Sequence, residues 1–186
     1  MPSFTKKAIV ESFLRLAGKK PLDKITVRDV VDDCGINRNT FYYYFQDIYA
    51  VLEELCGYLT ARMPSDATLA AAMETFFDLL GDFSSKYPRA TKGLVMSLGY
   101  DGLERYFTPA LDRIIVACLL RETAQNPQPR EYIQRLTTFV RHAVFGYCLD
   151  FLRAEKNEPF ADVGADLSHI LEGMIRPLRG ADSDKK

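Results

Sequence analysis

The chain has 186 residues, of which 47% are hydrophobic and 26% charged, and its formal net charge is −1 at pH 7. This composition is typical of a globular protein with a sizeable core and excludes wholesale disorder. There is no apolar run near ~18 residues and charges interrupt the first segment, so we expect neither a membrane span nor a secretion signal. We therefore predict a cytoplasmic protein with no membrane partner.

Four cysteines, Cys34, Cys56, Cys118 and Cys148, lie far apart in the sequence, and none belongs to a CxxC or Cys/His ligand pattern. Such residues are typical of small buried hydrophobic positions in a reducing compartment. We therefore expect free thiols, no metal site and no cofactor.

The amino-terminal residues predict three short helices. Apolar side chains recur at helical spacing over 4–17, and the glycine and proline that follow end this helix. Thr26, three residues before Asp29, is an N-cap in a variant of the capping box, and its helix ends after about two turns at Gly35. Asn37 then provides a second N-cap. Two short helices joined by a glycine-containing turn are the plan of a helix-turn-helix, whose second helix enters the DNA major groove.

The second of these helices contains three consecutive tyrosines, which cannot all face inward because successive helical residues rotate by ~100°. Phe41 and Phe45 are four residues apart and are expected in the core, as is Ile36 from the turn. Tyr42 and Tyr43 then face outward. The position of Tyr44 stays open, with packing against the next helix as one alternative.

Every later segment also has a helical pattern. Asp47 is an N-cap candidate for the next helix, a proline-containing break follows at 63–66, and Pro109 is expected to kink or divide a long helix. The expected helices cover 48–63, 67–87, 88–99, 101–123, 131–155 and 162–178. No period-two strand pattern bounded by hairpin signals occurs. We therefore predict an all-α protein.

With these elements in place, residues 26–55, TVRDVVDDCGINRNTFYYYFQDIYAVLEEL, resemble the DNA-binding domain of the TetR family of bacterial transcriptional regulators. The resemblance implies a helix-turn-helix domain over 1–48 and a helical ligand-binding and dimerisation domain over 49–180, and we expect a disordered tail over 181–186. The run over 23–49 is also similar to regulators near the activator of dihydroxyacetone kinase genes.

The resemblance and the helical geometry together suggest which residues contact DNA. Arg38, Asn39 and Thr40 lie on the first turn of the recognition helix, where side chains reach base edges, and tyrosine hydroxyls can donate to phosphates. For the basic residues the alternative is a solvated surface. The candidate set is Lys24, Thr26, Val27, Arg28, Asn37, Arg38, Asn39, Thr40, Tyr42 and Tyr43.

One departure from the family concerns the start of the fourth helix, where many relatives have a lysine that contacts a phosphate. This sequence has Ile48 there. In addition, eight basic residues face six acidic ones in the first fifty positions, a net charge of only +2, and the remainder sums to −3. Strong non-specific affinity for DNA is therefore not expected.

The carboxyl region offers candidate effector residues, for which ordinary core packing is the alternative. They are Phe76, Phe77, Tyr100, Tyr106, Phe107, Phe139 and His142. The helices over 131–154 and 162–176 have more apolar positions than one internal face needs, and the resemblance implies that they form a four-helix bundle with a second subunit.

The function implied is that of a homodimeric regulator that binds a palindromic, double-stranded operator and responds to a small-molecule effector, with repression as the family default. Two alternatives remain: an activator that works with a protein co-activator, and an interaction protein that has lost DNA binding. The sequence has two histidines, no clustered Cys/His set and no glycine-rich phosphate loop, so we do not expect an enzyme.

Overall fold

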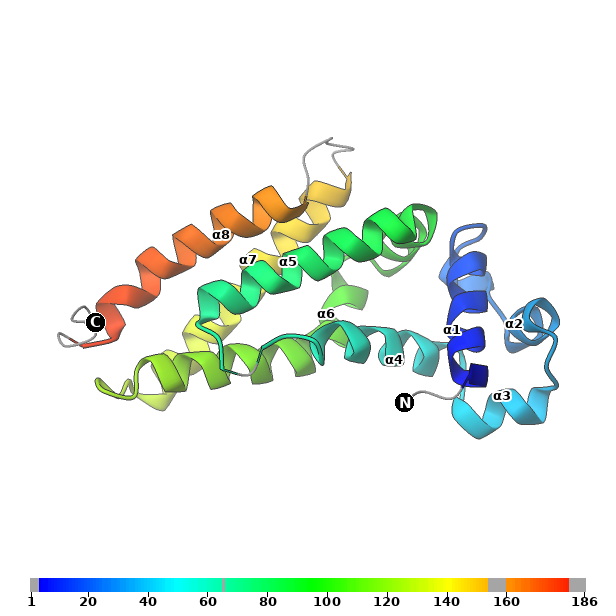
Figure 1. Ribbon diagram of the computed structural model, residues 1–186, viewed down its shortest axis with the longest axis horizontal. Coiled ribbons are helices and arrows are strands. Elements are labelled where there is room, and N and C mark those ends of the chain that lie inside the picture. Colours follow the sequence, from blue (N-terminus) through cyan, green and yellow to red (C-terminus); the bar gives the residue numbers. More distant parts are fainter. Residues whose placement is uncertain (1–3, 65, 154–159, 181–186) are drawn as a thin grey trace. The chain divides into compact units, whose positions relative to one another are not determined.

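In the computed structural model, which describes residues 4–64, 66–153 and 160–180, every regular element of the described chain is a helix (Figure 1). The predicted all-α class is therefore confirmed. The elements are α1 (Phe4–Ala17), η1 (Leu22–Lys24), α2 (Val27–Cys34), α3 (Arg38–Tyr44), α4 (Ile48–Thr60), α5 (Leu69–Lys86), α6 (Pro88–Glu122), α7 (Arg130–Arg153), α8 (Phe160–Ile175) and η2 (Arg176–Leu178).

By their packing, the described residues divide into two units. The first contains residues up to Tyr58 together with Asp82–Tyr106, and the second contains Leu59–Gly81 together with the residues from Phe107 onward. Both α5 and α6 thus contribute to both units. This division concerns contacts and not function, so the domain boundary expected after residue 48 remains a prediction. The expected tail over 181–186 lies outside the described residues.

The short helices of the first unit begin and end where local signals place them. Thr26 and Asp29 form a full capping box at the start of α2, and Gly35 ends this helix in the left-handed conformation with φ 70°. The Asn37 side chain accepts a hydrogen bond from the Thr40 amide, and Asp47 accepts one from the Ala50 amide. All three predicted N-caps are therefore confirmed.

The core of the first unit is small and built from apolar residues of α1, α2, α3 and α4. Phe13 and Phe41 are fully buried, as is Val30. The buried Ser12 hydroxyl donates to the Val30 carbonyl over 3.2 Å, which satisfies a polar group inside this core. Burying a side chain as large as phenylalanine contributes about 1.5–3 kcal/mol.

The first part of α6 packs closely against the end of α1. A Cβ atom placed on Gly93 would lie 2.1 Å from the Ala17 carbonyl oxygen, so this contact requires glycine. Within α6 the non-helical backbone angles occur at Gly99, with φ 58° and ψ −161°. The predicted break between two helices at this point is therefore present as a kink. Pro109, in contrast, lies inside α6 and does not divide it.

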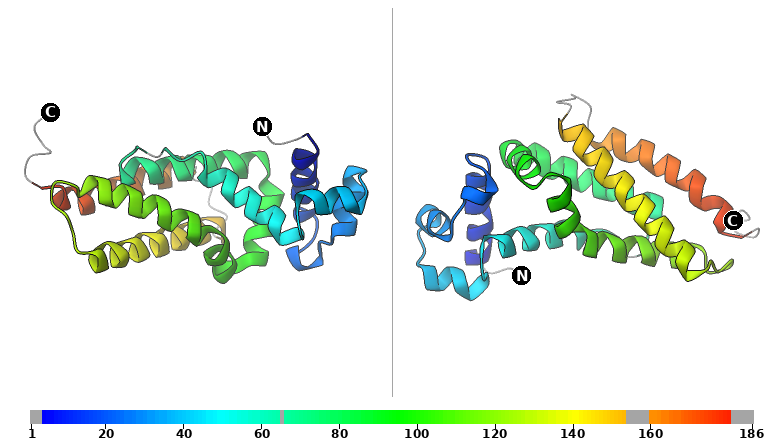
Figure 2. Two further views of the ribbon diagram at one scale, coloured as in Figure 1. Left: turned by 90° about the horizontal axis from the view of Figure 1, so that it is seen from below. Right: turned by 180° about the vertical axis from the view of Figure 1, so that it is seen from behind.

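The core of the second unit draws on several long helices. Its buried residues include Leu69, Met73, Phe76 and Phe77 of α5 and Leu111, Ile115 and Leu119 of α6, and the Phe76 ring meets that of Phe107 of α6 edge-on. Gly164 places α8 alongside α5, because a Cβ atom there would lie 2.8 Å from that of Phe77, and Figure 2 shows these two helices side by side. Between α6 and α7, the Arg141 guanidinium pairs with Asp112 at 2.9 Å.

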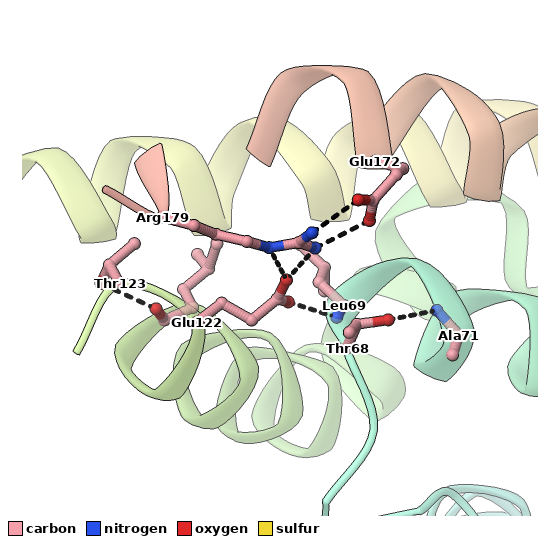
Figure 3. A network of polar contacts seen from close by, with 8 residues as sticks. Thr68, Leu69, Ala71, Glu122, Thr123, Glu172 and Arg179 are labelled. Atoms are coloured by element: carbon pink, nitrogen blue, oxygen red, sulfur yellow. Dashed lines mark hydrogen bonds and ion pairs between the residues drawn. The ribbon is translucent and has the colours of Figure 1, made fainter. Parts of the chain in front are cut away.

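A polar network closes the carboxyl-terminal end of the second unit (Figure 3). The Glu122 carboxylate, whose side chain is 5% exposed, accepts from the Leu69 amide at the start of α5 and pairs with the Arg179 guanidinium. Arg179 also donates to Glu172 of α8 over 2.5 and 2.7 Å. One arginine beyond η2 therefore joins the end of α6 to α8.

Some expected boundaries were wrong by one turn or less. The helix expected to reach residue 63 ends at Thr60, and the last helix ends at Ile175, after which the chain continues as the 3-10 turn η2. All four cysteines are free, as predicted, with Cys34 half-buried and the other three buried. No helix of the described chain is long and apolar enough to cross a membrane.

Candidate nucleic-acid interface

The recognition helix α3 has one exposed face and one buried face. Phe41 is fully buried and Phe45, which ends the helix, is 5% exposed. Four exposed side chains, those of Arg38, Asn39, Tyr42 and Tyr43, occupy positions i, i+1, i+4 and i+5, which lie together on the other side of a helix. The predicted inward positions of Phe41 and Phe45 and the outward positions of Tyr42 and Tyr43 are confirmed, whereas Ile36, which was expected in the core, is only half-buried.

The three consecutive tyrosines differ in environment. Tyr43 is 81% exposed and Tyr42 54% exposed, whereas Tyr44 is half-buried. Tyr44 meets Tyr43 edge-on, with ring centroids 4.9 Å apart, and Tyr42 meets Phe41 in the same way at 5.7 Å. These edge-to-face contacts pack the exposed Tyr42 and Tyr43 rings against neighbouring aromatic rings of the same helix.

Asn37 and Thr40 have hydrogen bonds within the helix end itself. The side-chain carbonyl oxygen of Asn37 accepts hydrogen bonds from the Thr40 amide over 2.8 Å and from the Thr40 hydroxyl over 3.1 Å. Its side-chain NH₂ group and the hydroxyl lone pairs of Thr40 stay available to another molecule. The cap therefore orients both polar groups beside Arg38 at the start of α3.

The start of α2 is already occupied by a carboxylate. Asp29 accepts from the Thr26 amide and hydroxyl over 2.7 and 2.6 Å, and it pairs with Lys20 at 2.7 Å. These contacts, that with Lys20 first, lower the pKa of Asp29 from 3.8 to about 2. The amide and hydroxyl of Thr26, a member of the candidate DNA-contacting set, therefore both donate to Asp29.

The basic candidates differ in their ion pairs. Lys24 pairs with Asp23 at 3.3 Å and Arg28 with Asp32 at 3.5 Å, and all four side chains are largely exposed. Pairs of this kind stabilise a protein by roughly 0–1 kcal/mol, so a phosphate can compete for them. Arg38 forms no ion pair with the part of the chain that the structure describes. Arg38, on the exposed face of α3, therefore breaks no such ion pair when it binds DNA, whereas Lys24 and Arg28 each break one.

Ile48 is 6% exposed and belongs to the core of the first unit. The position that holds a phosphate-contacting lysine in many relatives is therefore filled by a packed apolar side chain. The exposed residues next to it are Asp47, which caps α4, and Tyr49. This helix start offers no cation to DNA.

The seven candidate effector residues are divided between the two units. Tyr100 and Tyr106 belong to the first unit and the other five to the second. Phe76, which is buried, meets Phe77 and Phe107 edge-on at 5.8 and 6.5 Å. Phe139 and His142 are exposed on α7. The role of these residues in binding an effector stays a prediction.

Two features were missed by the sequence analysis. The first is the contact of Lys20 with Asp29, which links the end of α1 to α2 and has no local signature. The second is the network around Arg179, which joins residues more than fifty positions apart. Among the described residues, no group of three or more His, Cys, Asp or Glu side chains is placed to hold a metal ion.

These observations define a helix-turn-helix protein with an exposed recognition helix and a second helical unit. The family model described as "Bacterial regulatory proteins, tetR family" matches residues 9–55, which include this motif. Residues 9–55 therefore belong to the tetR family of bacterial regulatory proteins.

One curated relative and two solved structures are similar to the chain. An uncharacterized HTH-type transcriptional regulator, YerO of Bacillus subtilis (strain 168), is 32% identical over 132 residues, which are 71% of this chain and 41% of that protein. The chain thus spans about two fifths of the length of this relative.

The fold is also similar to that of the dihydroxyacetone kinase operon activator DhaS, with a TM-score of 0.68, 15% identity and coverage of 94% of this chain and 97% of the other. The fatty acid degradation regulator FadR from Bacillus halodurans gives a TM-score of 0.68 at 12% identity, with 95% and 98% covered. At these low sequence identities the similarity to both structures shows a common fold and nothing about function.

Proposed function

We propose that the protein is a homodimeric transcriptional regulator that binds a palindromic, double-stranded operator through α3. The observation that carries this proposal is the exposed face of α3, where Arg38, Asn39, Tyr42 and Tyr43 stand together above two buried phenylalanines. The major groove of B-DNA is wide enough to admit such a helix.

Each side chain of this face has a chemical partner on DNA. A guanidinium suits the O6 and N7 acceptors of guanine, and an asparagine amide suits adenine. The two tyrosine hydroxyls donate to phosphates, which set the position of the helix without reading sequence. We assign base contacts to Arg38 and Asn39, and backbone contacts to Tyr42, Tyr43 and Thr40. Lys24, Thr26, Val27, Arg28 and Asn37 complete the proposed DNA-contacting set near the helix starts.

A dimer is proposed because α7 and α8 expose apolar side chains in the single chain. On α7 these are Tyr132, Phe139 and Tyr147, spaced by seven and eight residues, and on α8 they are Ile170 and Met174, spaced by four. Such spacings form one stripe on each helix, and exposed apolar stripes mark association surfaces. A twofold dimer would bind two half-sites about 34–36 Å apart or at a multiple of that spacing.

Regulation requires a second state. We propose that an effector, either a small molecule or a protein co-activator, binds one state of the dimer better than the other and so changes its affinity for the operator. Neither the buried aromatic cluster of the second unit nor the fold likeness to an activator decides the sign of this effect. A reporter gene behind the selected operator decides between repression and activation.

The first test is selection of genomic fragments by the purified protein, followed by affinity measurement on the selected site. We expect saturable, sequence-selective binding that weakens as salt is raised, because phosphate contacts release counterions. Tyr43→Ala should weaken this binding by about tenfold or more. The matched control is Tyr58→Ala, which removes an exposed tyrosine of α4 and should change the affinity by less than about twofold. Absence of any selective site, or equal losses in both variants, would overturn the proposal.

A further inference from the structure

A cavity of about 560 Å³ lies within the first unit, and none of its lining residues comes from α3. Its wall is formed by the connection between α1 and α2, the start of α4 and the part of α6 around the kink. This volume is within the range of roughly 300–1,000 Å³ that is usual for small-molecule sites. The cavity is therefore large enough for a ligand of metabolite size.

Two carboxylates and two aromatic rings border this cavity. Asp23 comes from the connection between α1 and α2, and Asp101 comes from α6. Within the described chain, the only ion pair that either carboxylate forms is the exposed one between Asp23 and Lys24. The rings of Tyr49 and Tyr106 are parallel, with an interplanar angle of 2° and centroids 6.3 Å apart. Carboxylates and tyrosine faces both attract cations, and the ring bodies also offer apolar surface.

The one cationic side chain of the cavity wall is engaged with its neighbour. The Arg105 guanidinium hydrogen-bonds to Tyr106, and this contact partly offsets the effect of burial, which raises the pKa of the Tyr106 phenol. The charges of Asp23, Asp101 and Arg105 sum to −1 for the cavity wall. Leu22, which is buried, supplies an aliphatic wall.

The backbone around the cavity is held in an unusual conformation. The angles of Gly99 fall in a region that essentially only glycine adopts, and such residues gather at ligand sites and switches. The Ser97 hydroxyl accepts a hydrogen bond from the Leu22 amide over 3.1 Å, which ties the α1–α2 connection to α6. A molecule in the cavity therefore touches both the kink and the segment that leads into α2.

We propose that this cavity binds a small organic ammonium ion with a flat apolar body. The ammonium group would lie between Asp101 and Asp23, and the body would rest on the rings of Tyr49 and Tyr106. We further propose that binding changes the affinity of α3 for the operator, a step that rests on the function proposed above, because the same residues connect the cavity to α2.

The probe for this site is 2-phenylethylammonium, and phenylacetate, which carries the same ring with a negative charge, is its matched control. Methyl-¹³C methionine labels of the full chain report the location, since Met96 borders the cavity and Met73 is buried in the second unit. We expect a saturable shift of the Met96 signal below about 10 mM, because an open site gives so small a ligand a Kd on the order of 1 mM.

Substitutions then test the chemistry. Asp101→Asn should weaken binding of the ammonium ion by about tenfold, because it removes a charged partner at the same size. Asp82→Asn, an exposed carboxylate of the same unit outside the cavity wall, should leave the affinity unchanged. A shift at Met73 in place of Met96, equal binding of phenylacetate, or no saturable shift up to about 10 mM would overturn the site.

Operator binding with and without the probe separates the two parts of the proposal. A change in operator affinity that Asp101→Asn abolishes would support the regulatory role. Saturation at Met96 with unchanged operator affinity would overturn that role and keep the site. Failure to bind any operator would count against the proposed function alone, because the Met96 titration does not depend on DNA.

Discussion

The two units of this protein differ in their main polar contacts and in the chemistry of their exposed faces. In the first unit, side chains cap helix ends within three residues of themselves, as Asn37 does for Thr40, and the exposed face of α3 carries hydroxyl, amide and guanidinium groups. In the second unit, the main polar cluster joins Glu122 to Arg179 across the sequence, and the exposed stripes on α7 and α8 are apolar. The first surface suits a polyanion and the second suits another protein surface.

The largest expected effect concerns the apolar stripe of α7. Phe139→Asp would place a charge at the centre of the proposed dimer interface, where it must be desolvated without a partner. We expect the dimer dissociation constant to rise by at least about 100-fold, which corresponds to roughly 3 kcal/mol. Sedimentation equilibrium measures this change, and operator affinity should fall with it because one half-site supplies too few contacts.

The control for this variant is Gln134→Asp, an exposed position of α7 outside the stripe. It introduces the same charge on the same helix and should leave the dimer intact. Dissociation by both variants to the same extent, or by neither, would show that the stripe is not the interface.

The next effect tests the long-range network of the second unit. Arg179→Met would leave the Glu122 carboxylate, 5% exposed, without its cationic partner. Breaking such a buried pair from one side costs about 3 kcal/mol of unfolding free energy. Urea unfolding followed by circular dichroism measures the loss. The control is Arg130→Met at the exposed start of α7, which should cost less than about 0.5 kcal/mol of unfolding free energy. An equally small loss in Arg179→Met would mean that the network contributes little to the stability of the fold.

The third prediction concerns the close packing of α1 against α6 inside the first unit. Gly93→Ala would place a methyl group 2.1 Å from the Ala17 carbonyl oxygen, so α1 and α6 must move apart. Overpacking of this kind costs about 1–3 kcal/mol. The matched change is Gly57→Ala in α4, where no atom lies within 4 Å of the new methyl and helix propensity favours alanine by up to about 1 kcal/mol. Thermal unfolding of both variants should therefore shift in opposite directions.

The contrast between the units also explains what the sequence could predict. The bounds of α1, α2 and α3 and three N-caps follow from signals within a few residues, such as Thr26 three positions before Asp29. A break between helices was predicted after residue 99, and the structure has a kink at Gly99 within α6. Pro109 gave a similar signal, yet α6 continues through it, because tertiary packing can retain a helix that has lost one backbone hydrogen bond.

The candidate site was predictable to the same extent. The inward and outward faces of α3 follow from helical periodicity and were found as expected. The engagement of Thr26 by Asp29 and Lys20 was not foreseen, because Lys20 reaches α2 from the end of α1. The cavity that includes Tyr49 and Asp101 joins three separate segments, and no spacing within one segment indicates it.

The smallest effect concerns the carboxylate at the start of α2. The pKa of Asp29 is lowered from 3.8 to about 2, so the ionised form stabilises the fold above about pH 4, and this contribution is lost as the pH falls through 2. Because the side chain is 32% exposed and its ion pair with Lys20 is therefore screened by solvent, we expect Asp29→Asn to cost only about 1 kcal/mol at pH 6. The difference in unfolding free energy between wild type and variant should shrink as the pH falls from about 4 through 2, and it should approach zero only below pH 2, where Asp29 of the folded wild type is also protonated. Asp32→Asn, which removes an exposed carboxylate of the same helix, is the control for the loss of one negative charge at pH 6. A cost that stays constant over this range would mean that the Asn side chain loses packing or capping geometry, and that the charge of Asp29 contributes nothing to the helix start.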